Sequence, residues 1–205
     1  MRRYTSLAVA VLVLGCTDDG SKTTAPQLTG AVVTGANADR GGVPNSGNAG
    51  ERIDVVLLTG DQEVPPRDTP ANGQLWLKLN PDGQSVDYIL EVKNITNITM
   101  AHIHMEKPGV NGPIIVWLFP NARPTAVALP NGGGPVAHLV YEGTFSAADF
   151  RAPFAGQPLS VLLDAIKNGA AYGNVHTNDG VGATNTGPGD FPGGEIRGDL
   201  HSHGQ

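Results

Sequence analysis

The segment Leu75–Val92 constrains the fold most, because apolar residues alternate with other residues on both sides of a strong turn signal. Leucine occupies every second position in Leu75–Leu79, and apolar residues occupy every second position in Val86–Val92. A period of two is that of a β-strand with one buried face. Between them, in Asn80–Gly83, proline presets φ and glycine accepts a positive φ. The segment therefore predicts a β-hairpin.

Other segments extend this pattern to a whole domain. The apolar run Ile53–Leu58 predicts a strand buried on both faces. In Pro158–Gly169, a proline that can open a helix and a glycine that can end it enclose one apolar stripe, which predicts a helix. Further strands are expected at Ile114–Leu118, Val136–Phe145, Tyr172–Thr177 and Glu195–Leu200. Short strands, Gly/Pro turns and a single short helix indicate an all-β fold, a Greek-key β-sandwich of the immunoglobulin-like kind.

Composition limits both the size of the domain and its partners. The 205 residues include 28 glycines and 16 prolines, which suits one compact domain with unstructured extensions. The formal net charge is −6, and only 16% of the residues are charged. Nucleic acid is therefore excluded as an expected partner, because phosphate binding needs a basic face.

The N-terminus has the pattern of an export signal. Positive charge at Arg2 and Arg3 precedes the apolar stretch Leu7–Leu14, which is too short to span a bilayer. The only cysteine, Cys16, directly follows Val13-Leu14-Gly15, and this resembles the lipobox of bacterial lipoproteins. The commonest form of that motif has leucine in place of Val13 and a small residue in place of Leu14. An ordinary signal peptide cut nearby is the alternative.

The lipobox resemblance implies a division of the chain into three parts. Residues 1–15 are expected to be a lipoprotein signal peptide, and lipidation of Cys16 is expected to anchor the protein to a membrane, facing the periplasm or the cell surface. Residues 16–50 lack any sustained apolar period and are expected to form a flexible tether. Residues 51–205 are expected to fold without a disulfide, since the chain has a single cysteine.

Five blocks of the chain resemble, in order and spacing, the CHRD domain, a module named after chordin. The blocks are "LTGDQEVPP" (Leu58–Pro66), "ANGQLWLKL" (Ala71–Leu79), "AHIHMEKPGVNGPIIVWL" (Ala101–Leu118), "AAYGNVHT" (Ala170–Thr177) and "GGEIRGDL" (Gly193–Leu200). The Gly-rich segment Asp179–Pro192 departs from the family, which usually has a short turn there. The resemblance implies that residues 51–205 are a CHRD domain, an exported module with a non-catalytic binding or structural role and an unknown protein or small-molecule partner.

Two histidines one residue apart, His102 and His104, suggest a site. In an extended strand both project from one face, about 7 Å apart along the strand. His176, in the block that resembles the family's "NVHT", is a natural third ligand, and three neutral imidazoles suit copper or zinc. The alternative is structural: the same rings can hydrogen-bond to backbone carbonyls and to Asn174, Glu195 or Asp199. The sequence leaves both interpretations open.

A weaker resemblance, to the Cu/Zn superoxide dismutase-like sandwich, concerns the His-x-His strand and implies possible redox activity.

Glu195 and Arg197 share a strand face and are expected to form a structural ion pair, with Asp199 as a further partner. In "EVPP" (Glu63–Pro66), a single glutamate without a paired acid is poor evidence for general acid/base catalysis. Enzymatic activity therefore stays undecided, with a non-catalytic role favoured.

The lipobox generates a first prediction. Replacing Cys16→Ser removes the thiol that would carry the lipid, so the protein should move from the membrane fraction to the soluble exported fraction. Fractionation and immunoblotting of the producing cells measure this. Unchanged membrane association of the variant would contradict lipidation.

Overall fold

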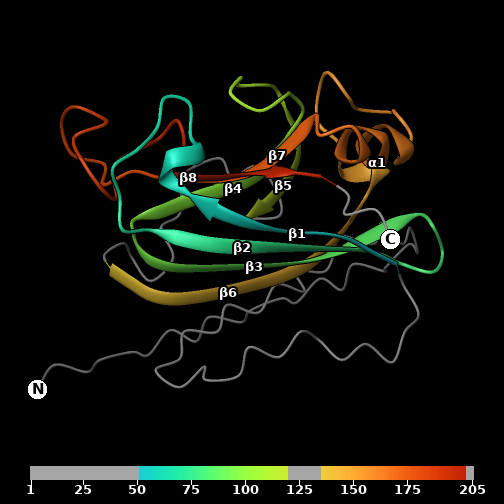
Figure 1. Cartoon of the computed structure of the whole chain (residues 1–205), viewed down its shortest axis with the longest axis horizontal. Coiled ribbons are helices and arrows are strands. Elements are labelled where there is room, and N and C mark those ends of the chain that lie inside the picture. The colour runs from blue at the N-terminus through green and yellow to red at the C-terminus, as the bar shows by residue number, and fades with distance from the viewer. Residues whose placement is uncertain (1–50, 120–134, 202–205) are drawn as a thin grey trace, which may run out of the picture.

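The computed structural model describes residues 51–119 and 135–201 (Figure 1). The predicted signal peptide, Cys16 and the predicted tether lie outside these described residues. The strands and the helix are β1 (Glu51–Thr59), β2 (Asn72–Leu79), β3 (Ser85–Thr96), β4 (Ile98–His104), β5 (Ile114–Phe119), β6 (Pro135–Ser146), α1 (Ser160–Lys167), β7 (Ala171–Thr177) and β8 (Ile196–Leu200), with short 3-10 helices η1 (Gly60–Gln62) and η3 (Ala147–Asp149).

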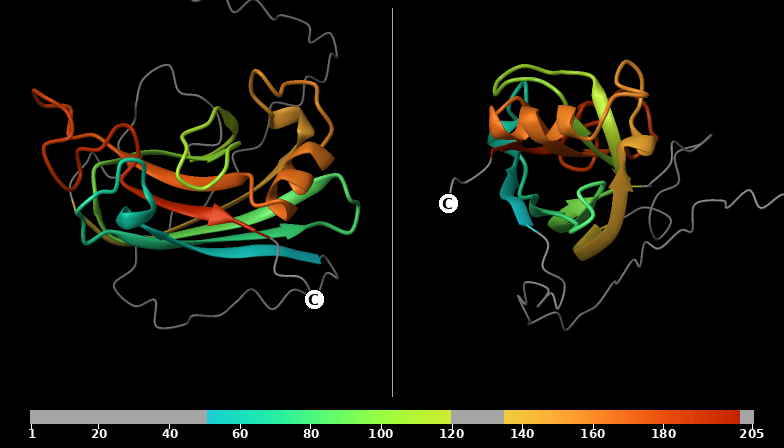
Figure 2. Two further views of the ribbon diagram at one scale, coloured as in Figure 1. Left: turned by 45° about the horizontal axis from the view of Figure 1, so that its top comes forward. Right: turned by 90° about the vertical axis from the view of Figure 1, so that its right-hand side faces the viewer.

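The strands form two facing layers of an almost closed antiparallel sheet (Figures 1 and 2). The strand order is β5-β4-β7-β8-β1-β2-β3-β6, and the layers meet at β1 and β8, which pair through Thr59 and Arg197. The chain changes layer three times: between β3 and β4 at the single residue Asn97, between β5 and β6, and between β6 and β7. The predicted all-β sandwich with one short helix is confirmed.

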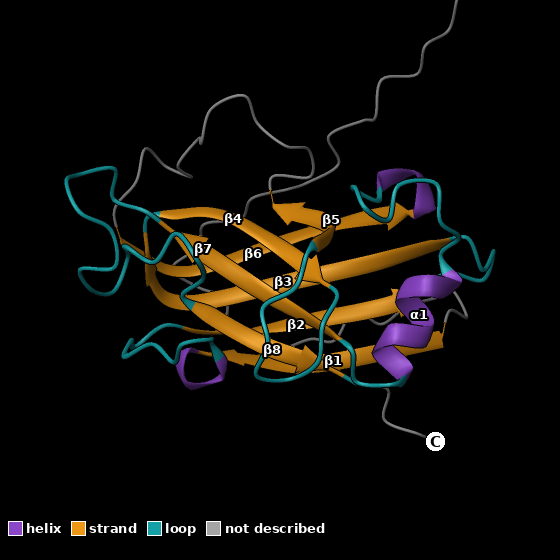
Figure 3. Cartoon of the chain, turned by 90° about the horizontal axis from the view of Figure 1, so that it is seen from above, coloured by secondary structure: helices purple, strands orange, loops and turns teal. Residues whose placement is uncertain are grey.

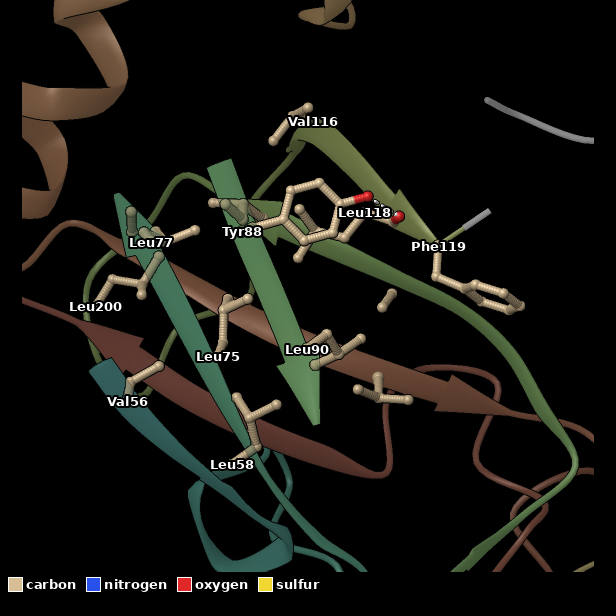
Figure 4. Packing of buried hydrophobic residues seen from close by; sticks show 14 of the residues in the cluster. Val56, Leu58, Leu75, Leu77, Tyr88, Leu90, Val116, Leu118, Phe119 and Leu200 are labelled. Carbon is tan, nitrogen blue, oxygen red and sulfur yellow. Dashed lines mark hydrogen bonds between the residues drawn. The ribbon is translucent and has the colours of Figure 1, made fainter. Parts of the chain in front are cut away.

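The predicted hairpin is formed by β2 and β3. Leu75 pairs with Leu90 and Leu77 pairs with Tyr88 in an antiparallel register. Gly83 closes the turn with a φ of 64°, and its N–H donates to the carbonyl of Asn80 at 2.9 Å. The alternate apolar side chains of both strands point between the two layers and form much of the core (Figure 4).

A sharp corner at Asn97 moves the chain from one layer to the other. Asn97 has a φ of 51°, a left-handed conformation that asparagine tolerates better than most residues. The strand before it, β3, pairs with β2 and β6, whereas β4 pairs with β5 and β7. This corner therefore places the His-x-His strand beside the strand that carries His176.

The first strand, β1, differs from its prediction. Val56 and Leu58 are buried in the core, but the side chain between them, Leu57, is 58% exposed. The expectation of a strand buried on both faces is therefore wrong, because the outer face of β1 meets solvent at Leu57. An unbroken apolar run does not by itself reveal how many of its faces are covered.

The helix predicted in Pro158–Gly169 forms as α1. It packs Leu162, Ala165 and Ile166 against the core, and Gly169 follows its end with a φ of 61°. In the described part of the chain, no helix has the length and hydropathy needed to cross a membrane.

A buried hydrogen bond joins the two layers across the core, and it generates the second prediction. The Tyr88 hydroxyl on β3 donates to the Leu118 carbonyl on the edge strand β5 at 2.5 Å (Figure 4). Tyr88→Phe should lower the free energy of unfolding by about 1–3 kcal/mol, because it leaves a buried carbonyl without this donor. Urea denaturation measures the change, and a loss of stability below about 0.3 kcal/mol would contradict the assigned role.

Candidate metal centre

His102 and His104 lie on the face of β4 that points away from the core. The intervening Ile103 and the preceding Ala101 are fully buried between the layers, as strand alternation requires. The two histidines are buried as well, on the other face. Loops cross that outer face of the β4–β7–β8 layer (Figure 3). One of them, residues 105–113, follows β4 directly and lies over the layer (Figure 2).

His176 joins the pair from the neighbouring strand β7. The register sets His102 opposite Asn174 and Met100 opposite His176, so the third imidazole lies diagonally from the first. The His102 Nδ1 and His176 Nε2 atoms are 3.1 Å apart. One ring nitrogen from each of the three histidines lies within 4.8 Å of the others. The structure thus brings together all three residues that the sequence proposed as metal ligands.

Two loop carbonyls fix the orientation and tautomer of two of these rings. His104 Nδ1 donates to the Gly112 carbonyl at 2.8 Å, and His176 Nδ1 donates to the Pro192 carbonyl at 2.9 Å. Because a carbonyl oxygen only accepts, the proton of each neutral ring is on Nδ1. Each Nε2 therefore carries a lone pair, which is the form that binds a metal ion.

Two of the buried ring nitrogens have no hydrogen-bond partner in the part of the chain that the structure describes. These are the Nε2 atoms of His102 and His104. The third, His176 Nε2, lies 3.1 Å from His102 Nδ1 and 3.0 Å from the Asn174 Oδ1 atom. A buried polar atom without a partner costs about 1–3 kcal/mol, so two in one cluster need an explanation.

Burial keeps the imidazoles neutral. Desolvation, reinforced by the neighbouring imidazoles, lowers the pKa of His102 from 6.5 to about 2. Desolvation also lowers the pKa of His176 to about 4, although its bond to Pro192 opposes the shift. Burial also lowers the pKa of His104, although its bond to the Gly112 carbonyl and the nearby Asn174 side chain oppose the shift. At neutral pH, all three therefore offer unprotonated nitrogen.

Aromatic side chains form the walls of the cluster. Trp117 lies edge-on to His102 with ring centroids 4.2 Å apart, and Tyr172 stacks on His104 with centroids 4.8 Å apart. The Arg197 guanidinium covers the Tyr172 ring at 3.5 Å from its centroid. These contacts hold the rings in place and limit the access of water.

Arg197 holds the 105–113 loop over the site. It is fully buried, and its guanidinium donates to the carbonyls of Val110 and Lys107 and to the Asn111 side chain. The loop that Arg197 fixes is the one that supplies the Gly112 carbonyl to His104.

The ion pair predicted between Glu195 and Arg197 forms instead between Arg197 and Asp199, whose Oδ1 atom lies 2.8 Å from Arg197 Nη2. Glu195 accepts hydrogen bonds from the hydroxyls of Thr69 and Thr177, both at 2.5 Å, and from the Gly189 N–H at 2.9 Å. Glu195 therefore ties the 178–194 loop to β7 and does not serve the arginine.

Glu63 was not proposed as a site residue from the sequence, yet it lies beside the cluster. Its carboxylate is buried and 3.4 Å from the Asn174 Nδ2 atom, and burial raises its pKa to about 7. The contact joins positions 111 residues apart, and no local pattern at Glu63 reveals it. By contrast, His138 pairs with Glu91 on β3 at 2.7 Å and does not join the cluster.

Comparison with known proteins gives one match. A family model described as the CHRD domain matches residues 55–200, more than half of the 205-residue chain. No curated protein and no solved structure matches the chain.

The lowered histidine pKa values generate a third prediction for the metal-free protein. Between about pH 6.5 and 4.5, the unfolded chain protonates His102 and His176 while the folded chain does not, so each of these two histidines makes stability fall as pH falls, by roughly 1.4 kcal/mol per pH unit. The pKa of His104 is also lowered on folding, so this histidine acts in the same direction. Glu63 acts in the opposite direction over this window, because its pKa is raised on folding. The histidines outnumber it, so the net stability should fall.

Urea denaturation in the presence of a chelator, at pH 7.5, 6 and 5, measures this slope. His176→Asn should flatten the slope, and His138→Asn, which alters a histidine outside the cluster, should retain it. Equal or greater stability of the unaltered protein at pH 5 would show that the cluster is not held neutral.

Proposed function

The chain belongs to the CHRD domain family, and on that premise we propose that it is an extracytoplasmic module that binds a transition-metal ion through His102, His104 and His176. Membership of the family indicates an extracytoplasmic binding or structural module. The metal ion is the ligand that the chemistry of this cluster favours. Imidazole nitrogen suits copper and zinc, which are the expected ions.

One observation carries the proposal: among the described residues, the buried Nε2 atoms of His102 and His104 have no hydrogen-bond partner, and they lie in a cluster of three neutral imidazoles. A purely structural role accounts for the bonds from His104 and His176 to the loop carbonyls and for the bond that His102 Nδ1 donates to His176 Nε2. It does not account for two lone pairs buried without donors. A metal ion would satisfy them, and the Nδ1 bonds would then act as the outer hydrogen bonds that orient metal-bound histidines.

We propose binding and not catalysis as the main role. No Cys/His or Ser/His/Asp arrangement of a nucleophile stands out in the sequence. The single cysteine, Cys16, is already assigned to the lipid anchor. Redox activity at a bound copper ion is the second candidate, and the same metal analysis is its first requirement.

The proposed location is the surface of a membrane, with Cys16 as the lipidated anchor and residues 16–50 as the tether. The lipobox-like sequence before Cys16 supports this, and the polar, aperiodic composition of residues 17–50 suits a flexible spacer. A lipid anchor would hold the metal-binding domain outside the cytoplasm while leaving it free to meet its partners.

The fourth prediction tests the metal directly. The exported domain, purified without an affinity tag, should contain close to one equivalent of copper or zinc when measured by inductively coupled plasma mass spectrometry. The His102→Ala/His104→Ala double variant removes two ligands and should lose the metal. His138→Ala removes a histidine outside the cluster and should keep it.

Two results together would contradict the proposal. The unaltered protein would contain no metal even after incubation with copper or zinc salts, and the double variant would lose thermal stability. Such a result would assign the three histidines a structural role.

A further inference from the structure

Glu63 is a buried carboxylate whose hydrogen bonds do not account for its burial. It follows η1 and is 3% exposed. One oxygen accepts from the Val64 N–H at 3.3 Å, and the other accepts from Asn174 Nδ2 at 3.4 Å. Both distances are long for a hydrogen bond to an ionised group. Burying a carboxylate with such weak partners is costly, so its position needs a reason.

Asn174 links this carboxylate to the histidine cluster. Its Oδ1 atom is 3.0 Å from His176 Nε2, and its Nδ2 atom is the one that faces Glu63. Gly194 makes this proximity possible: a Cβ at that position would overlap the Glu63 Oε1 atom and lie 2.9 Å from Asn174 Nδ2. Its φ of 125° is also a conformation that favours glycine.

The proposed ligands bring no charge of their own. Three neutral imidazoles leave the whole charge of a metal ion uncompensated in a buried site, where charge is costly. The Arg197 cation is close enough to lower the pKa of His104, although Asp199 pairs with that cation. A divalent ion therefore needs a negative group nearby, and the carboxylate behind Asn174 is placed to supply it.

We propose that Glu63 is the counter-charge of this metal site, positioned through Asn174, and that it favours a divalent over a monovalent metal ion. The proposal rests on the proposed metal-binding function of His102, His104 and His176. Glu63 is a positioning and specificity residue in this account, and the metal ligands remain the three imidazoles.

The charged and titratable groups that face Glu63 fit this role. Arg67 and Arg197 both act to lower its pKa, and Tyr172 lies within electrostatic reach, yet burial dominates and raises the pKa to about 7. In the described part of the chain neither arginine forms an ion pair with Glu63. The carboxylate is thus not neutralised by a fixed partner, and above pH 7 it can compensate an arriving cation.

The fifth prediction compares Zn²⁺ with Ag⁺, which share a closed d shell but differ in charge. Binding to the tag-free domain is measured at pH 8 by competition with chelators in chloride-free buffer. Glu63→Gln keeps the shape of the side chain but removes its charge. Coulomb energy scales with ionic charge, so this variant should weaken Zn²⁺ binding about tenfold and Ag⁺ binding about threefold.

Two further variants separate charge from shape. Glu63→Asp keeps the charge but shortens the side chain, and it should retain more of the preference for Zn²⁺ than Glu63→Gln does. Glu142→Gln changes an exposed carboxylate on β6 by the same charge and should leave both affinities unchanged, because solvent screens it.

Three outcomes would overturn the inference. Equal weakening of both ions by Glu63→Gln would indicate a structural role for Glu63. Unchanged affinities in that variant, with Zn²⁺ bound tightly by the unaltered protein, would refute the counter-charge and leave the metal-binding function in place. Failure of the unaltered protein to bind either ion would refute the metal-binding function itself, and the counter-charge with it.

Discussion

The carbonyls of Gly112 and Pro192 determine what the histidine cluster can do. Each accepts the Nδ1 proton of one imidazole, so His104 and His176 are held as neutral rings with a free lone pair on Nε2. Burial lowers the pKa values of both rings and keeps that state at neutral pH. Both carbonyls belong to loops on the outer face of one layer, and Arg197 fixes the 105–113 loop from beneath. The chemistry of the site therefore depends on how the loops are held.

The sandwich supplies the rigid support that such a site requires. The inner faces of β4 and β7 belong to the core, so the outer faces that carry the histidines cannot shift without disturbing the packing of both layers. The corner at Asn97 brings β4 into the same layer as β7. Loops then cover the outer face, which explains why polar residues on the outside of a sheet are nevertheless buried. A pre-arranged group of ligands is the expected result.

Much of this arrangement follows from the sequence, because strand alternation is a local property. The period of two in Leu75–Val92 fixes the hairpin, and the same rule sets His102 and His104 on one face. Long-range geometry is different. Nothing local indicates that Glu63 lies beside Asn174, since this depends on the order of strands in the sheet. In the strand expected at Glu195–Leu200, Glu195 and Asp199 flank Arg197 at equal separation on one face, so spacing alone does not decide which one pairs with it.

The central claim is that three imidazole nitrogens coordinate one transition-metal ion on the outer face of the β4–β7–β8 layer. X-ray absorption spectroscopy of the tag-free, zinc-loaded domain tests it most directly. The account predicts three nitrogen neighbours at about 2.0–2.1 Å, with the multiple scattering of imidazole rings. A first shell made only of oxygen atoms, without imidazole scattering, would contradict it.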